Sequence, residues 1–121
     1  MRTLLLTTLV TMMPLPCLAD DAFGVWARGD GIAHVRIAPC GGAICATNVW
    51  VNDPSGKEAV GDKLVLTVKP TADGFAGKAY DPKRDLNFGF ELHVDRDRMT
   101  TRGCLIGGLL CKSVDWTRIS G

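Results

Sequence analysis

Two pairs of cysteines are the residues whose type and spacing most directly indicate chemistry. Cys40 and Cys45 are five positions apart, and Cys104 and Cys111 are seven positions apart. Neither pair has the Cys-x-x-Cys spacing of a thioredoxin-type redox centre or a zinc knuckle. The fifth cysteine, Cys17, falls in a predicted signal peptide and would be removed with it. We therefore expect the other four to form two structural disulfides, as an even number of cysteines commonly does in exported domains.

Glycine-containing turns between the cysteines favour one of the three possible connectivities. A two-residue turn at Gly42-Ala43 would place the members of the first pair on opposed strand positions, and a turn at Gly107-Gly108 would do the same for the second pair. Opposed strand residues have Cα atoms about 4.5–5.5 Å apart, which a disulfide can bridge. The sequence therefore favours Cys40–Cys45 and Cys104–Cys111, and cross-pairing between neighbouring hairpins is the alternative.

Three tryptophans are candidates for a binding role. Trp26, Trp50 and Trp116 each have the large apolar surface that can line a ligand cavity. The same surface suits residues that fill or cover a hydrophobic core, which is the alternative interpretation of all three. Their position in the fold decides between these roles.

Histidines and carboxylates do not form a recognisable catalytic or metal-binding pattern. His34 and His93 fall on the polar faces of alternating segments, and neither has a second ligand at a zinc spacing. The aspartates cluster at predicted turns, where their side chains bond nearby backbone amides. No carboxylate pair, phosphate loop or nucleophile elbow stands out. We predict that the protein is not an enzyme and binds no metal or other cofactor; a paired-carboxylate hydrolase is the alternative.

The longest predicted connection is the candidate binding loop. It covers residues 52–63 and carries Lys57, Glu58 and Lys63. Long loops on small β scaffolds often carry binding residues, so these three are candidates for ligand or partner contacts. A solvated linker is the alternative.

The N-terminal residues are typical of a signal peptide. Arg2 supplies a positive charge, residues 3–16 are uncharged and largely apolar, and Cys17-Leu18-Ala19 places small residues before a cleavage site. The apolar run is shorter than the roughly 20 residues that span a bilayer. We expect a signal peptide over 1–19 and a single domain over 20–121, exported to the periplasm or secreted. Lipid attachment through Cys17 is the alternative.

The charge balance argues against nucleic-acid and membrane partners. Loss of Arg2 with the signal peptide leaves 13 basic and 13 acidic residues, a net charge of zero. A nucleic-acid surface would need a clustered basic excess. No basic amphipathic helix favours a membrane surface, and no segment is long enough for a transmembrane span. We expect a monomer.

Short alternating segments separated by turn residues predict an all-β domain. The clearest segment is 86–94, where Leu86, Phe88, Phe90, Leu92 and Val94 share one face of a strand. About eight strands follow from such patterns, at 23–28, 32–38, 44–51, 64–69, 75–80, 86–94, 98–104 and 109–119. Tight turns between them predict an antiparallel up-and-down meander, closed into a lipocalin-like barrel that leaves no free edge. A two-sheet sandwich is the runner-up.

Motifs along most of the domain resemble a known family. They are Gly24-Val25-Trp26, the cysteine segment 40–45, Tyr80-Asp81-Pro82, the run beginning Arg102-Gly103-Cys104, and the closing Trp116-Thr117-Arg118. Together they are similar to the exported-protein family called domain of unknown function 2147. The sequence departs from that family's pattern in local turns, with Ala46 in place of a frequent glycine. The family has no established activity, so the resemblance implies fold and export without chemistry.

A looser similarity is to the lipocalin-like barrels. Those barrels pair a Gly-x-Trp on the first strand with an Arg on the last, and the Arg packs over the indole where the barrel closes. Gly24, Trp26 and Arg118 stand in the corresponding places here. The resemblance implies a cation–π contact between Trp26 and Arg118, with the two ends of the chain side by side.

The favoured function is a non-catalytic binding module of the cell envelope for a small apolar ligand. Its weakness is that many inward-facing side chains are bulky, and an eight-stranded barrel has room for side chains or one small ligand. These side chains are Val35, Ile37, Leu64, Leu66, Phe88, Phe90, Leu92 and Met99. The alternative is a protein-interaction or inhibitor module, which predicts an exposed apolar patch beside residues 52–63.

Overall fold

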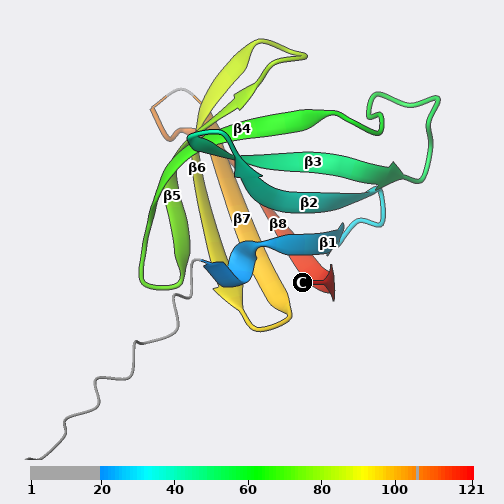
Figure 1. The fold of residues 1–121 in the computed structure, drawn as a ribbon. Helices are drawn as coiled ribbons and strands as arrows, with labels where there is room; N and C mark the ends of the chain where they lie inside the picture. The colour runs from blue at the N-terminus through cyan, green and yellow to red at the C-terminus, as the bar shows by residue number, and fades with distance from the viewer. Residues whose placement is uncertain (1–19, 106) are drawn as a thin grey trace, which may run out of the picture.

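The computed structural model describes residues 20–105 and 107–121, which form an eight-stranded barrel (Figure 1). The elements in chain order are η1 (Asp20–Ala22), β1 (Gly24–Arg28), β2 (Ala33–Cys40), β3 (Ala43–Val51), β4 (Lys63–Pro70), β5 (Gly74–Asp81), β6 (Leu86–Asp95), β7 (Arg98–Leu105) and β8 (Leu110–Ser120). The signal peptide expected over 1–19, with its cleavage site and Cys17, lies outside the described residues. No helix in the described part of the chain has the length and apolar character of a membrane span.

The strands form one closed antiparallel meander. Each strand pairs with the next in sequence, and β1 pairs with β8 to complete the ring. Every strand bound lies within two residues of its expected position. The predicted up-and-down barrel is confirmed, and the two-sheet sandwich is excluded. Closure pairs both outer strands with each other, and the ladder between β3 and β4 is among the shortest, with residues 44–47 paired to residues 63–66.

The inward-facing row of β6 shows how burial changes along the barrel. Leu92 and Val94 are buried, Phe88 and Phe90 are half-buried, and Leu86 is 43% exposed. Because alternate side chains of a strand point to one face, all five belong to the same inward row. The barrel is therefore filled near Val94 and open near Leu86. We call these the closed end and the open end.

A compact apolar cluster occupies the closed end. It contains Ala22, Trp26, Val35, Ile37, Phe75, Leu92, Val94 and Met99. The η1 turn brings Ala22 into this cluster (Figure 1). Gly74 is required here, because a Cβ atom at this position would lie 1.8 Å from the Leu92 carbonyl oxygen. The backbones of β5 and β6 thus approach too closely for any side chain at that point.

The first disulfide has the expected partners but a different register. Cys40 and Cys45 are bonded, with Cα atoms 5.7 Å apart. The turn is Gly41-Gly42 rather than Gly42-Ala43, so Cys40 faces Ala43 and the disulfide runs diagonally across the hairpin. The predicted turn was wrong by one residue. Gly41 has a φ of +64°, which suits a type II′ turn, and two adjacent glycines leave the sequence unable to choose between the registers.

The second disulfide lies at the open end, between directly opposed residues. Cys104 faces Cys111 across the β7–β8 ladder, and their Cα atoms are 4.1 Å apart. Gly107 and Gly108 both have positive φ, as a type I′ turn requires. The register is the one that the Gly-Gly turn predicts, and each disulfide stays within its own hairpin.

Candidate ligand-binding cavity at the open end

A cavity of about 720 Å³ occupies the open end of the barrel. This volume lies in the range of about 300–1,000 Å³ that is typical of small-molecule sites. Its apolar walls include Val35, Ile37, Leu64, Phe88, Phe90 and Met99. The concern that bulky side chains would fill the whole interior is not borne out, because these six line the cavity. Val35, Ile37 and Met99 also belong to the cluster at the closed end, so they form the boundary between the packed end and the cavity.

Trp116 forms part of the cavity wall, and its indole N–H group already has a hydrogen-bond partner. Its indole N–H donates a hydrogen bond of 2.9 Å to the hydroxyl oxygen of Thr101, which is buried on the neighbouring strand. Both residues line the cavity. The indole therefore offers apolar surface to a ligand without an unpaired N–H group.

Trp26 and Arg118 lie at the closed end, outside the cavity. They are register partners on β1 and β8, and the guanidinium carbon of Arg118 is 4.2 Å from the centre of the Trp26 ring system. Arg118 also donates to the backbone carbonyls of Asp21, Phe23 and Arg96. These contacts join the two ends of the chain, so this pair has the barrel-closing role rather than the ligand role.

Trp50 does not line the cavity, contrary to one of its two expected roles. The ring is 43% exposed and stacks on His34 outside the barrel, with 4.4 Å between the ring centres. The cause is a β-bulge: Val35 pairs with Asn48 but His34 pairs with Trp50, which leaves Val49 as an extra residue. A bulge reverses the alternation that follows it, so Trp50 points outward and Val51 points inward.

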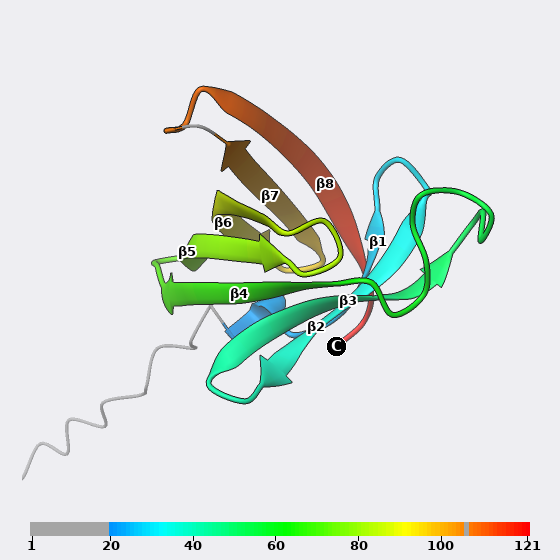
Figure 2. The same ribbon diagram turned by 90° about the horizontal axis from the view of Figure 1, so that it is seen from above.

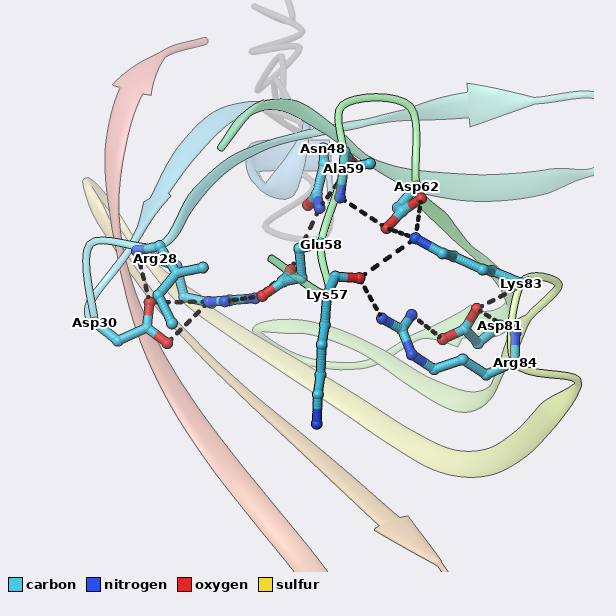
Figure 3. A network of polar contacts seen from close by, with 11 residues as sticks. Arg28, Asp30, Asn48, Lys57, Glu58, Ala59, Asp62, Asp81, Lys83 and Arg84 are labelled. Carbon is cyan, nitrogen blue, oxygen red and sulfur yellow. Dashed lines mark hydrogen bonds and ion pairs between the residues drawn. The ribbon is translucent and has the colours of Figure 1, made fainter. Parts of the chain in front are cut away.

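The connection between β3 and β4 crosses the open end and is anchored on one side by Glu58. The guanidinium of Arg28 donates two hydrogen bonds to the Glu58 carboxylate, one of them of 3.0 Å (Figure 3). The side-chain amide of Asn48 donates to the same carboxylate and to the Ala59 carbonyl, each at 3.3 Å. A two-pronged arginine–carboxylate pair is geometrically specific, so this contact sets the position of the connection.

A second anchor holds the other side of the same connection. Lys83 forms an ion pair of 3.0 Å with Asp62, and Arg84 forms one of 2.9 Å with Asp81. Both basic residues also donate to the backbone carbonyl of Lys57, at 3.3 and 3.1 Å (Figure 3). The connection is thus fastened to β1 and β3 on one side and to the β5–β6 turn on the other. We call residues 52–62 the strap.

The electrostatics of the anchors keep Glu58 and Asp62 ionised. The hydrogen bonds from Arg28 lower the pKa of Glu58 below its ordinary value, and the pKa of Arg28 is raised in return. The hydrogen bond from Lys83 lowers the pKa of Asp62. A general acid of the glycosidase type needs a raised pKa. These two carboxylates therefore fit the role of fastening the strap better than that of donating a proton.

All three strap-region candidates from the sequence, Lys57, Glu58 and Lys63, line the cavity. Sequence reasoning missed other polar residues of the same wall, namely Arg28, Asn48, Asp62, Asp81, Arg84 and Lys112. Asn48 could have been identified from the sequence, since it is a polar residue in the inward-facing row that also contains Ile44 and Ala46. The others lie at strand ends and turns, where a charged residue is ordinary and gives no signal by itself.

The histidines lie apart from the cavity. His93 is exposed, with its Nδ1 atom 2.9 Å from a carboxylate oxygen of Asp73, and His34 packs on Trp50. Within residues 20–105 and 107–121, no group of three or more His, Cys, Asp or Glu side chains is arranged to hold a metal ion.

Comparison with known protein families gives a match over most of the barrel. A family model described as "Uncharacterized protein conserved in bacteria", domain of unknown function 2147, matches residues 24–118. Comparison with curated proteins and with solved structures found no match. The matched range begins at the first residue of β1 and ends at Arg118, so it includes both Trp26 and Arg118, the residues that close the barrel. The chain therefore belongs to the bacterial family named domain of unknown function 2147.

Proposed function

We propose that the protein is a non-catalytic binding module that holds a small, mainly apolar molecule in the open end of its barrel. The observation that carries this proposal is the cavity of about 720 Å³, whose deeper wall is built from aliphatic and aromatic side chains. Burial of an apolar ligand there would contribute roughly 25 cal/mol for each Å² of apolar surface removed from water. The closed end needs no ligand, because its own side chains fill it.

The proposed place of action is the cell envelope, after export. Two disulfides are typical of proteins that fold in an oxidising compartment, such as the periplasm. The N-terminal sequence has the charge and apolar run of a signal peptide. In that compartment a rigid barrel would keep a poorly soluble molecule in solution.

Exposed apolar side chains around the open end favour a second candidate function, binding to another protein. Val60 on the strap is 64% exposed, and Leu109 and Leu110 at the β7–β8 turn are 81% and 60% exposed. Figure 2 shows the strap and this turn on opposite sides of the barrel. Side chains of this kind suit contact with a partner, but their wide separation favours the cavity as the main site.

The test is binding of N-phenyl-1-naphthylamine, a neutral apolar dye whose fluorescence rises in an apolar site. Val114 lines the cavity, whereas its neighbour Ser113 is exposed outside it. Val114→Trp should obstruct the cavity and weaken dye binding by at least about tenfold, since a filled pocket excludes the ligand. Ser113→Trp adds the same indole on the outer face and should bind the dye as the unmodified protein does.

A third variant separates the cavity from the exposed leucines. Leu109→Gln removes the most exposed apolar side chain of the β7–β8 turn and should leave dye binding unchanged. Dye binding that is lost in Leu109→Gln and kept in Val114→Trp would move the site to the surface and contradict the proposal. Absence of dye binding to the unmodified protein would contradict it as well. Circular dichroism spectra of all variants show whether each one folds.

A further inference from the structure

The charges that line the cavity are unevenly paired. Five lining residues are basic and three are acidic, so the wall carries a net charge of +2. All three carboxylates are used in ion pairs: Glu58 with Arg28, Asp62 with Lys83, and Asp81 with Arg84. The lining lysines Lys57, Lys63 and Lys112 have no ion pair or side-chain hydrogen bond to any other residue that the structure describes. Asp30 lies within electrostatic range of Lys112 but forms no ion pair with it. The excess charge of the mouth therefore resides on lysine ammonium groups.

The backbone of Lys57 is held by hydrogen bonds, whereas its side chain has no ion pair or hydrogen bond to another described residue. Its carbonyl oxygen accepts hydrogen bonds from Lys83 and Arg84, and its neighbour Glu58 is bound by Arg28. Figure 3 shows the Lys57 side chain extending away from both anchors of the strap. The residue is also a lining residue of the cavity. A cation whose base is fixed and whose charge is unpaired is suited to receive an anion.

Lys112 reaches the same cavity from the opposite part of the barrel. It continues the inward row of β8 that contains Trp116 and Val114, and all three line the cavity. Its register partner on β7 is Gly103, and the ring of Phe88, another lining residue, packs against that glycine. The row on β8 thus runs from aromatic Trp116 through aliphatic Val114 to cationic Lys112, and it ends at Leu110, which also lines the cavity.

We propose that the ligand is an anionic amphiphile, with its apolar body between the walls of the barrel and its carboxylate at the mouth, where Lys57 on the strap and Lys112 on β8 supply cations. The inference rests on the proposed function and adds the chemical class of the ligand. The wall predicts this polarity, because apolar groups lie deep and unpaired cations lie at the opening. An anion would offset the charge of +2, whereas a cationic head group would add to it.

The test compares three molecules with the same twelve-carbon chain: laurate, dodecanol and dodecyltrimethylammonium. Each displaces the neutral dye from the unmodified protein near neutral pH, where laurate is ionised, below its aggregation concentration. Laurate should bind at least about fivefold more tightly than dodecanol, and the cationic compound should bind most weakly. The preference for laurate should shrink as salt is added, because salt screens charges at an open mouth.

Lysine variants assign the preference to residues. Lys57→Met and Lys112→Met shorten the unbranched side chain by one heavy atom and remove its charge, and neither changes the backbone carbonyl that fastens the strap. Each should weaken laurate binding by roughly three- to tenfold and leave dodecanol binding unchanged. Lys69→Met is the matched control, because Lys69 is exposed on β4 and does not line the cavity.

Each outcome has a separate meaning. Equal binding of laurate and dodecanol, or equal laurate binding by the Lys57, Lys112 and Lys69 variants, would overturn the anionic ligand and leave the apolar binding function intact. Failure of all three molecules and of the dye to bind would overturn both proposals.

Discussion

The two ends of this barrel are built from the same eight strands but are held by different forces. At the closed end, Trp26 and Leu92 are fully buried, and Arg118 ties the chain ends together through backbone carbonyls and the Trp26 ring. At the open end, ion pairs fasten a strap across a cavity whose lining residues range from buried to exposed. Both ends have the same inward and outward alternation, so alternation alone does not decide whether an interior is filled.

The comparison teaches that stability and binding are divided between the ends. Apolar burial at the closed end removes large side chains from water, and such burial dominates folding energy. Ion pairs near solvent contribute only about 0–1 kcal/mol each to folding, but they fix the position of a loop. We infer that substitutions at the closed end mainly change the free energy of unfolding. Substitutions at the open end should mainly change binding and the mobility of the strap.

The largest expected effect is at Trp26. Trp26→Ala should lower the free energy of unfolding by about 3–5 kcal/mol, because it leaves a cavity in the packed end and removes the ring beneath Arg118. Trp116→Ala should cost about 1–2 kcal/mol less, since Trp116 is half-buried beside space that is already open. Denaturation by urea, followed by circular dichroism, measures both. An equal or larger cost at Trp116 would contradict the division between the two ends.

The two disulfides test whether stability and binding are divided between the ends, because one disulfide lies at each end. Replacing either pair with alanines should lower the free energy of unfolding by about 2 kcal/mol, as expected for bridges that close short loops. Only the Cys104/Cys111 replacement should also weaken binding of the neutral dye, because Cys111 lines the cavity and Cys40 and Cys45 do not. Identical dye binding by both double variants would show that the open end does not depend on its disulfide.

The smallest expected effect on stability is at Glu58. Glu58→Gln should lower the free energy of unfolding by less than about 1 kcal/mol, because the pair with Arg28 is near solvent. The same substitution should release one anchor of the strap and increase hydrogen exchange of its backbone amides. Asp53→Asn is the control, since Asp53 lies on the strap but is fully exposed and bonds only Ser55 and the local turn. Equal exchange in the two variants would show that Glu58 is not an anchor.

The strap should also respond to acid. The pKa of Glu58 is lower in the folded protein than its ordinary value of about 4.3. The ionised Glu58 therefore makes its full contribution to folding stability at pH values above the ordinary pKa. As the pH falls below the ordinary value and through the lowered one, the carboxylate takes up a proton and the contribution is lost. Asp62 has the same direction of shift and the same sign. The protection factors of the strap amides, which correct each exchange rate for the intrinsic rate at that pH, should fall over that acidic range in the unmodified protein, and less steeply in Glu58→Gln.

Sequence patterns predicted most of the fold and about half of the residues of the candidate site. Strands and turns are local features, and the family motifs at Trp26 and Arg118 implied how the ring closes. The first hairpin shows the limit, because Gly41 and Gly42 serve a tight turn equally well and the sequence cannot choose one. Trp50 shows another, since a bulge at Val49 reversed its direction without any signature in composition. Lys57, Glu58 and Lys63 were accessible to reasoning only through the length of their loop.

The amino-acid sequence by itself determined the all-β class, the number of strands, the disulfide partners and the family, because these depend on alternation, turn residues and short spacings. Tertiary structure alone decided that the cavity exists. Phe88 and Leu92 occupy equivalent places in the sequence pattern, but Leu92 lies in the apolar cluster that fills the closed end and Phe88 lines the cavity. Tertiary structure also decided which charges are paired. Arg28 meets Glu58 across 30 residues of sequence, and contacts at such a distance depend on the closed barrel that brings them together.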